Sequence, residues 1–103
     1  MTNYICRGRR KPLNNGSSLI TLEINGLSVS YVSVTDTCHD AAYRATEIIL
    51  TIGRKIGASS LVVRTTPLVR NQMNGIWRTR KRATKAGRAA CLRAAAGMKV
   101  QYV

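Results

Sequence analysis

The spacing of apolar residues changes once between positions 18 and 56, and this change constrains the fold more than any other feature. In Ser18–Ile24 apolar side chains alternate with polar ones, which is the period-two pattern of a half-buried strand. Asn25-Gly26 supplies the positive φ angles of a tight turn, and Leu27–Val34 is a second β-prone run. From Ala41 onward the spacing becomes three to four residues. The sequence therefore predicts a β-hairpin followed by an amphipathic helix.

The predicted helix has recognisable ends, because Asp36-Thr37 can cap its start and Gly57 stands where a C-terminal glycine is expected. Its apolar positions are Ala41, Ala42, Ala45, Ile48, Ile49, Ile52 and Ile56. Downstream, Leu61–Val63 predicts a short buried strand, Ala83–Ala96 a second helix and Met98–Tyr102 a last strand. The order β-β-α-β-α-β predicts an α/β (α+β) fold, a single domain with its helices packed on one mixed sheet.

The length of 103 residues allows one domain. Residues 1–16 are predicted to form a basic N-terminal extension, because Pro12 and Asn14-Asn15-Gly16 discourage regular structure. Such an arm either stays solvated or becomes ordered along a phosphate backbone. Residues 17–103 form the predicted domain, with a basic loop at 67–82.

The charge balance points to a polyanionic partner. The chain has 17 Lys and Arg against 4 Asp and Glu, a formal net charge of +13. Self-repulsion of this size is relieved when phosphates neutralise the cations, and counterion release adds affinity. A basic helix on a membrane surface needs bulky apolar residues opposite its charges, whereas the basic part of this chain offers mostly alanine. No apolar run approaches the roughly 18 residues of a membrane span.

The cations concentrate in the second half, where ten Lys and Arg follow Ala58 without any Asp or Glu. On a helix, Arg78, Lys81, Lys85 and Arg88 recur at steps of three and four and project as one stripe. A merely solvated basic face is the alternative interpretation. Trp77, the single tryptophan, either stacks on an unpaired base or anchors its loop to the core.

Enzymatic interpretations find little support in the sequence. Neighbouring residues at a helix start point in different directions, so Cys38-His39 does not form a nucleophile–base pair. The single histidine and three scattered cysteines lack zinc-site spacing. Carboxylates are few, and Asp36 and Asp40 are explained as helix-start residues. We therefore predict a protein that is not an enzyme, with no catalytic residue, metal site, cofactor or small-molecule substrate.

Several motifs, in their order and spacing, resemble the small-subunit ribosomal protein eleven family, the universal protein of the ribosomal platform. Asn14-Asn15 leads into the hairpin, and Ala41-Ala42 opens a helix that runs to Gly57 and the following strand. The second helix of that family begins with Gly-Arg and ends with Ala-Ala-Gly. The matching residues here are Gly87-Arg88, Leu92-Arg93-Ala94 and Ala95-Ala96-Gly97.

The resemblance implies a structural constituent of the ribosome that binds small-subunit ribosomal RNA at the platform, beside neighbouring small-subunit ribosomal proteins. The chain departs from the family pattern at residues 34–36 and 66–82 and lacks its basic C-terminal tail. These departures are typical of an organellar ribosome, so the expected location is mitochondrial, with chloroplast or bacterial cytoplasm as alternatives. A DNA-associated architectural or regulatory protein of phage or plasmid type is the alternative function.

Charge pattern and resemblance together give one set of predicted RNA-binding residues. These are Arg7, Arg9, Arg10, Lys11, Asn14, Asn15, Arg70, Trp77, Arg78, Arg80, Lys81, Arg82, Lys85, Gly87, Arg88 and Arg93.

Overall fold

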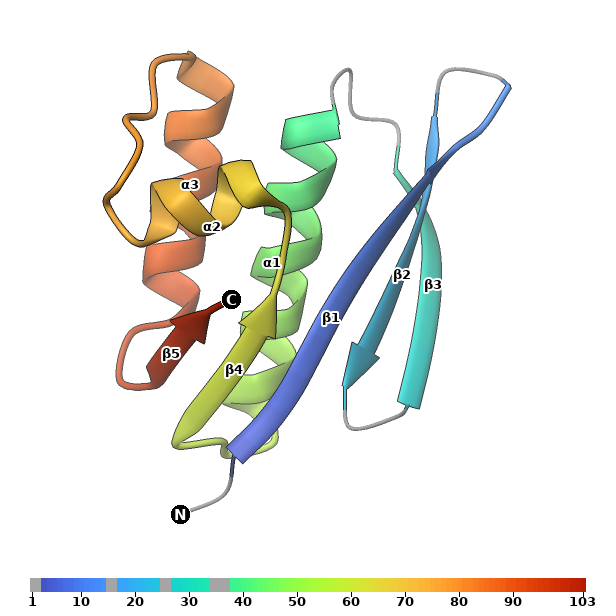
Figure 1. Cartoon of the computed structure of the whole chain (residues 1–103). Coiled ribbons are helices and arrows are strands. Elements are labelled where there is room, and N and C mark those ends of the chain that lie inside the picture. Colours follow the sequence, from blue (N-terminus) through green and yellow to red (C-terminus); the bar gives the residue numbers. More distant parts are fainter. Residues whose placement is uncertain (1–2, 15–16, 25–26, 34–37) are drawn as a thin grey trace.

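The computed structural model describes residues 3–14, 17–24, 27–33 and 38–103 of the chain (Figure 1). These residues form a five-stranded sheet in the order β3-β2-β1-β4-β5, together with helices α1, α2 and α3. The strand β1 pairs with β2 antiparallel and with β4 parallel, so the sheet is mixed. The predicted fold class, an α/β domain with helices packed on one mixed sheet, is confirmed.

The central strand β1 (Asn3–Pro12) lies within the segment predicted to be a basic extension. It runs beside β2 (Ser18–Ile24) on one side and β4 (Ser60–Arg64) on the other. Over Asn3–Pro12 the extension prediction is therefore wrong. Because β1 has neighbours on both edges, ladder hydrogen bonds hold it in place without a regular apolar alternation.

The predicted hairpin is present as β2 and β3 (Leu27–Ser33). Ile24 faces Leu27 across the ladder, and the turn residues Asn25 and Gly26 lie outside the described residues. The predicted alternation is confirmed, since Ile20 and Leu22 are 1% and 2% exposed. The helix cap predicted at Asp36-Thr37 also lies outside the described residues.

The long helix α1 (Cys38–Lys55) supplies much of the core, and α3 (Arg82–Ala94) lies beside it (Figure 1). The two helices approach closely because position 87 is glycine: a Cβ added there would lie 2.8 Å from the Cβ of Tyr43. Gly57 has a positive φ of 79°, as its predicted role after α1 requires. The buried cluster includes Tyr43, Leu50, Leu61 and Val69.

One helix lies in the region that was predicted to be a loop, and the last strand is present where the sequence predicted it. A short helix, α2 (Pro67–Met73), occupies the first part of the predicted loop at 67–82. The last strand, β5 (Lys99–Tyr102), pairs parallel with β4 and completes the sheet. In the described part of the chain, no helix has both the length and the apolar character of a membrane span.

Candidate nucleic-acid interface

The turn after α2 folds back onto that helix. Thr66 caps the start of α2, where its side chain accepts a hydrogen bond from the backbone N–H of Val69, and Pro67 fits the first turn. At the other end, the N–H groups of Ile76 and Trp77 both donate to the carbonyl of Asn71, at 2.8 and 3.1 Å. Gly75, with φ of 75°, allows this reversal. The residues that follow α2 are thereby held against it.

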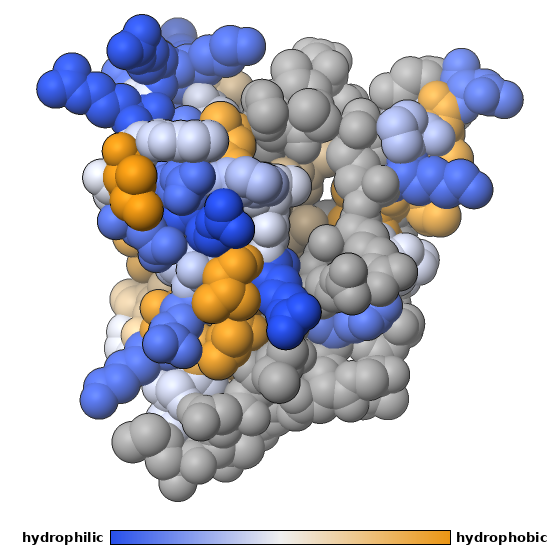
Figure 2. Space-filling view, viewed as in Figure 1, coloured by the Kyte–Doolittle hydropathy of each residue, from blue (hydrophilic) through white to orange (hydrophobic). Residues whose placement is uncertain are grey.

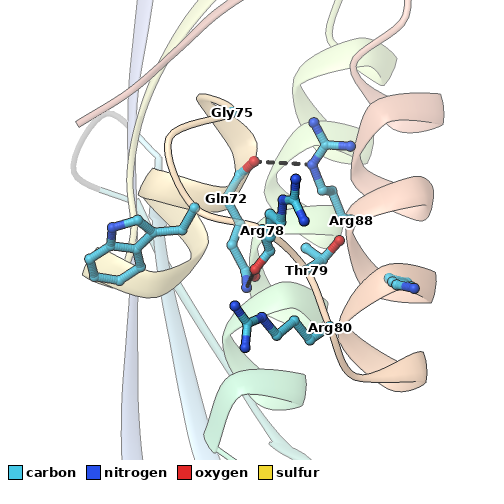
Figure 3. A pocket seen from close by; sticks show the side chains of 8 residues that line it. Gln72, Gly75, Arg78, Thr79, Arg80 and Arg88 are labelled. Carbon is cyan, nitrogen blue, oxygen red and sulfur yellow. Dashed lines mark hydrogen bonds between the residues drawn. The ribbon is translucent and has the colours of Figure 1, made fainter.

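Buried Gln72 joins three elements of the structure. Its side-chain oxygen accepts a 2.7 Å hydrogen bond from the Tyr43 hydroxyl on α1, and its amide nitrogen donates to the carbonyl of Arg78 at 3.0 Å. Its backbone carbonyl accepts a 3.0 Å hydrogen bond from Nε of Arg88 on α3 (Figure 3). Gln72 therefore fixes the basic loop and the Arg88 side chain relative to the core.

The start of α3 carries positive charge without compensation. The helix begins at Arg82 after the cap residue Lys81, with no acidic residue in its first turn. Thr84 bonds back to the carbonyl of Lys81 at 2.9 Å, so its hydroxyl helps to close the first turn. Cations at a helix N-terminus oppose the helix dipole, whereas anions there are favoured. Figure 2 shows strongly hydrophilic side chains gathered where α3 begins.

An open pocket of about 590 Å³ lies between α2, the following loop and α3 (Figure 3). Four cations and no carboxylate line it, and Trp77 is 49% exposed at its wall. Across the residues that the structure describes, none of the four cations makes an ion pair. The lining residues are Gln72, Gly75, Trp77, Arg78, Thr79, Arg80, Lys85 and Arg88. Such a pocket matches an anion, because its cations are not neutralised from within the described protein.

Five of the residues predicted to bind RNA meet in this pocket: Trp77, Arg78, Arg80, Lys85 and Arg88. Sequence reasoning missed the uncharged lining residues Gln72, Gly75 and Thr79. The buried amide of Gln72 and the reversal at Gly75 have roles that no charge pattern reveals. Trp77 is half exposed, and its stacking on a base and its anchoring of the loop both stay predictions. Whether these residues bind nucleic acid stays a prediction.

The remaining predicted residues lie elsewhere or are not described. Lys81 and Arg82 are exposed at the start of α3, Arg70 lies on α2, and Arg93 is in the last turn of α3. Gly87 packs against Tyr43. Lys11 and Asn14 are exposed at the end of β1 and in the turn beyond it. The side chains of Arg7, Arg9 and Arg10, and the whole of Asn15, lie outside the described part.

The predicted helical stripe is only partly formed. Because α3 begins at Arg82, Arg78 and Lys81 precede the helix and do not follow its periodicity. Lys85 and Arg88 are on the helix and both line the pocket, whereas Arg78 reaches it from the loop. Arg88 is well inside α3, whereas the family resemblance implied a helix that begins at Gly87-Arg88. The grouping of Arg78, Lys85 and Arg88 results from the fold of the loop.

Two buried groups near the pocket have strongly shifted acidities. Burial raises the pKa of the Tyr43 hydroxyl to about 12, an increase that nearby Arg88 partly offsets. Burial also raises the pKa of the Cys91 thiol to about 12, and the charge of Glu47 adds to this. Cys91 is fully buried and its Sγ lies 3.5 Å from the carbonyl of Tyr43. Both groups are therefore neutral at physiological pH and belong to the packing between α1 and α3.

Metal-assisted phosphate hydrolysis needs side chains that hold the ions, usually clustered carboxylates. The side chains that the structure describes contain no group of three or more Asp, Glu, His or Cys placed to hold a metal ion. Glu23 and Glu47 lie on different elements, and the side chains of Asp36 and Asp40 are outside the described part. The described residues thus do not fit a metal ion, and we assign no hydrolytic step to them.

The sequence matches no protein-family model and no curated protein, but solved structures share its fold. The N-terminal RNase H domain of a Mycobacterium tuberculosis protein, solved as a fusion with maltose-binding protein, superposes with a TM-score of 0.88. The comparison covers 100% of this chain and 83% of that chain at 16% identity. RNase H1 from Halobacterium salinarum gives a TM-score of 0.84, covering 99% and 86% of the two chains at 17% identity. The chain has the fold of RNase H domains.

This fold match overturns the family prediction. The chain was expected to resemble small-subunit ribosomal protein eleven, whereas the similar structures are RNase H domains. The predicted role as a structural ribosomal constituent in translation is therefore wrong as well. The predicted partners, small-subunit ribosomal RNA and ribosomal proteins, are contradicted by the same finding. The motifs that supported the resemblance mark helix ends and sites of close helix packing, such as the contact of Gly87 with Tyr43. Such features occur in α/β proteins of unrelated function.

The prediction of a non-enzymatic protein is contradicted by the same finding, because both similar structures are ribonuclease domains. The mitochondrial location is not tested by the fold and stays a prediction.

Proposed function

We propose that the chain is an RNase H-like domain that binds an RNA–DNA hybrid, with the basic pocket as part of its substrate-binding surface. Both similar structures are named RNase H, a class that acts on RNA paired with DNA. One observation carries the proposal: Arg78, Arg80, Lys85 and Arg88 meet in one pocket without an anionic partner among the described residues. The fold is associated with a polyanionic substrate, and the pocket carries positive charge that is not neutralised. Both observations support the same function.

The mode of binding follows from the residue types in the pocket. Arginine forms paired hydrogen bonds to phosphate, and lysine contributes a point charge. Contacts of this kind position a duplex but carry no base sequence. We therefore expect recognition of the hybrid through its backbone and shape, with little preference among sequences. The hydrogen bonds of Gln72 keep the loop and Arg88 in place before the substrate arrives.

Fluorescence anisotropy with labelled duplexes of one sequence tests this proposal. The duplexes are an RNA–DNA hybrid, double-stranded DNA and double-stranded RNA, each measured at several salt concentrations. We expect the hybrid to bind most tightly, with affinity falling steeply as salt rises. Failure to bind the hybrid at low salt, or affinity independent of salt, contradicts the proposal. Gel analysis of the same mixtures with Mg²⁺ or Mn²⁺ shows separately whether the RNA strand is cut.

A further inference from the structure

The charge of the pocket exceeds what one phosphate of a continuous strand can neutralise. Four cations line one cavity, and no carboxylate lies among its lining residues. A phosphodiester carries a single negative charge, whereas a phosphate monoester carries about −1.5 to −2 at neutral pH. A strand end that bears a monoester therefore presents about −2.5 to −3 when its neighbouring diester is included. This charge is closer to that of the four cations than the charge of two adjacent internal phosphates, which is about −2.

The shape of the site also suits a strand end. A volume of about 590 Å³ lies within the range of pockets that enclose small ligands. A duplex backbone that crossed the pocket would place only one or two phosphates in it. A terminal nucleotide, in contrast, can enter with its phosphate, sugar and base.

Trp77 gives the pocket a surface for a base. Its side chain is 49% exposed, although large aromatic side chains are usually well buried. Bases inside a duplex are already stacked on both faces, but an unpaired terminal base has a free face. Stacking of one base on an aromatic side chain stabilises single-stranded complexes. Trp77 and four cations line the same pocket, which thus offers the two features that an unpaired, phosphorylated nucleotide needs.

The phosphate-binding groups are partly fixed in advance. Nε of Arg88 is engaged by the Gln72 carbonyl, so its two terminal nitrogens remain for a ligand. The backbone of Arg78 is held through its carbonyl by the Gln72 amide, while its side chain extends toward Arg88 (Figure 3). Groups that are oriented before binding lose less conformational entropy when the ligand arrives.

We propose that this pocket binds the phosphorylated terminal nucleotide of a single-stranded nucleic-acid end, with the monoester among Arg78, Arg80 and Arg88 and the base against Trp77. The inference rests on the proposed binding of an RNA–DNA hybrid and adds a preference for strand ends. It distinguishes an end carrying phosphate from the same end carrying hydroxyl.

The test compares hybrids that carry a short single-stranded overhang ending in 5′-phosphate, 3′-phosphate or hydroxyl. A hydroxyl-ended overhang that is one nucleotide longer has the same number of phosphates as the phosphorylated overhang and serves as its control. A blunt hydroxyl-ended hybrid measures binding that does not depend on the strand end. We expect at least one phosphorylated end to bind about tenfold more tightly than the longer hydroxyl-ended strand. Trp77→Ala should weaken binding of that end by about tenfold and binding of the blunt hybrid much less.

The double variant Arg78→Gln/Arg80→Gln should abolish the preference for phosphate. Lys55→Gln/Lys99→Gln, the same charge change at exposed positions outside the pocket, should keep it. Equal affinity for phosphate and hydroxyl ends, with the blunt hybrid still bound, overturns the inference and leaves the proposed function intact. A preference that survives in the pocket variant overturns its assignment to this pocket.

Two further results complete the test. Absence of binding to every hybrid removes the proposed function and the inference together. A free nucleoside monophosphate is the second probe, added in a thermal shift assay. If it stabilises the protein while no phosphorylated strand end is preferred, the pocket takes free nucleotides and the inference is wrong.

Discussion

Nε of Arg88 donates a hydrogen bond to the backbone carbonyl of Gln72 at 3.0 Å, which links α3 to the last turn of α2. The side chain of the same Gln72 bonds to Tyr43 and to the loop that carries Arg78. The geometry of the basic pocket therefore depends on an uncharged residue of its own lining.

Replacement of Gln72 by Leu should lower the free energy of unfolding by about 1–3 kcal/mol, because the Tyr43 hydroxyl and the Arg78 carbonyl lose their partner. Urea unfolding followed by circular dichroism measures the change. Gln101→Leu, at an exposed position of β5, is the matched control and should change stability little. In the double variant Tyr43→Phe/Gln72→Leu the losses should not add, since the unsatisfied hydroxyl is gone. Additive losses would show that the two side chains do not interact.

Gly87→Ala should destabilise the protein by about 1–2 kcal/mol even though alanine favours helices, because the new methyl group overpacks the contact between α1 and α3. The added Cβ would lie 2.8 Å from Tyr43 Cβ, an atom next to the backbone of α1. Gly53→Ala is the comparison, since its Cβ meets Cδ1 of Leu61, the end of a flexible side chain. Thermal unfolding of both variants measures the difference. A larger loss for Gly53→Ala contradicts the predicted packing of α3 on α1.

The free energy of unfolding should fall at alkaline pH by more than the titration of exposed groups alone would cause. Burial raises the pKa of the Cys91 thiol from 9.0 to about 12. Between these values the unfolded chain has lost the proton that the folded chain keeps, so the free energy of unfolding falls as pH rises above 9. Tyr43 adds to the fall above pH 10 for the same reason.

Urea unfolding of the wild type and of Cys91→Ala between pH 8 and 11 tests this dependence. The variant is expected to be less stable at pH 8, because it leaves a cavity. Its stability should nevertheless decline less steeply with pH than that of the wild type. Parallel curves would mean that the thiol does not contribute to the pH dependence.

The elements with strong local signals were predictable from sequence. Alternation in Ser18–Ile24, three- and four-residue spacing after Ala41, and the glycine at position 57 each correspond to an observed element or end. Thr66-Pro67 is also a recognisable helix start, although residues 67–82 were predicted to form a loop. The central strand β1 was missed because its pairing on both edges comes from tertiary structure, and its arginine-rich sequence gives no apolar pattern.

The positive charge of the candidate site could be predicted from the sequence, but the arrangement of its residues could not. Arg78, Arg80, Lys85 and Arg88 were chosen for their charge, and the structure brings them into one pocket. Their grouping depends on the buried amide of Gln72 and the reversal at Gly75, contacts that have no sequence pattern of their own. The family prediction was wrong because its motifs consist of helix ends and of small residues at close contacts. Such residues are determined by packing and do not indicate function.

The salt dependence of hybrid binding tests most directly whether the basic pocket is the nucleic-acid contact. Anisotropy titrations of one blunt RNA–DNA hybrid at several salt concentrations give the slope of log affinity against log salt for three proteins. Arg78→Gln/Arg80→Gln should bind more weakly than the wild type, with a slope shallower by about 2 if each arginine neutralises one phosphate. Lys55→Gln/Lys99→Gln should keep nearly the slope of the wild type. Identical slopes and affinities for the pocket variant and the wild type would contradict the assignment of nucleic-acid binding to this pocket.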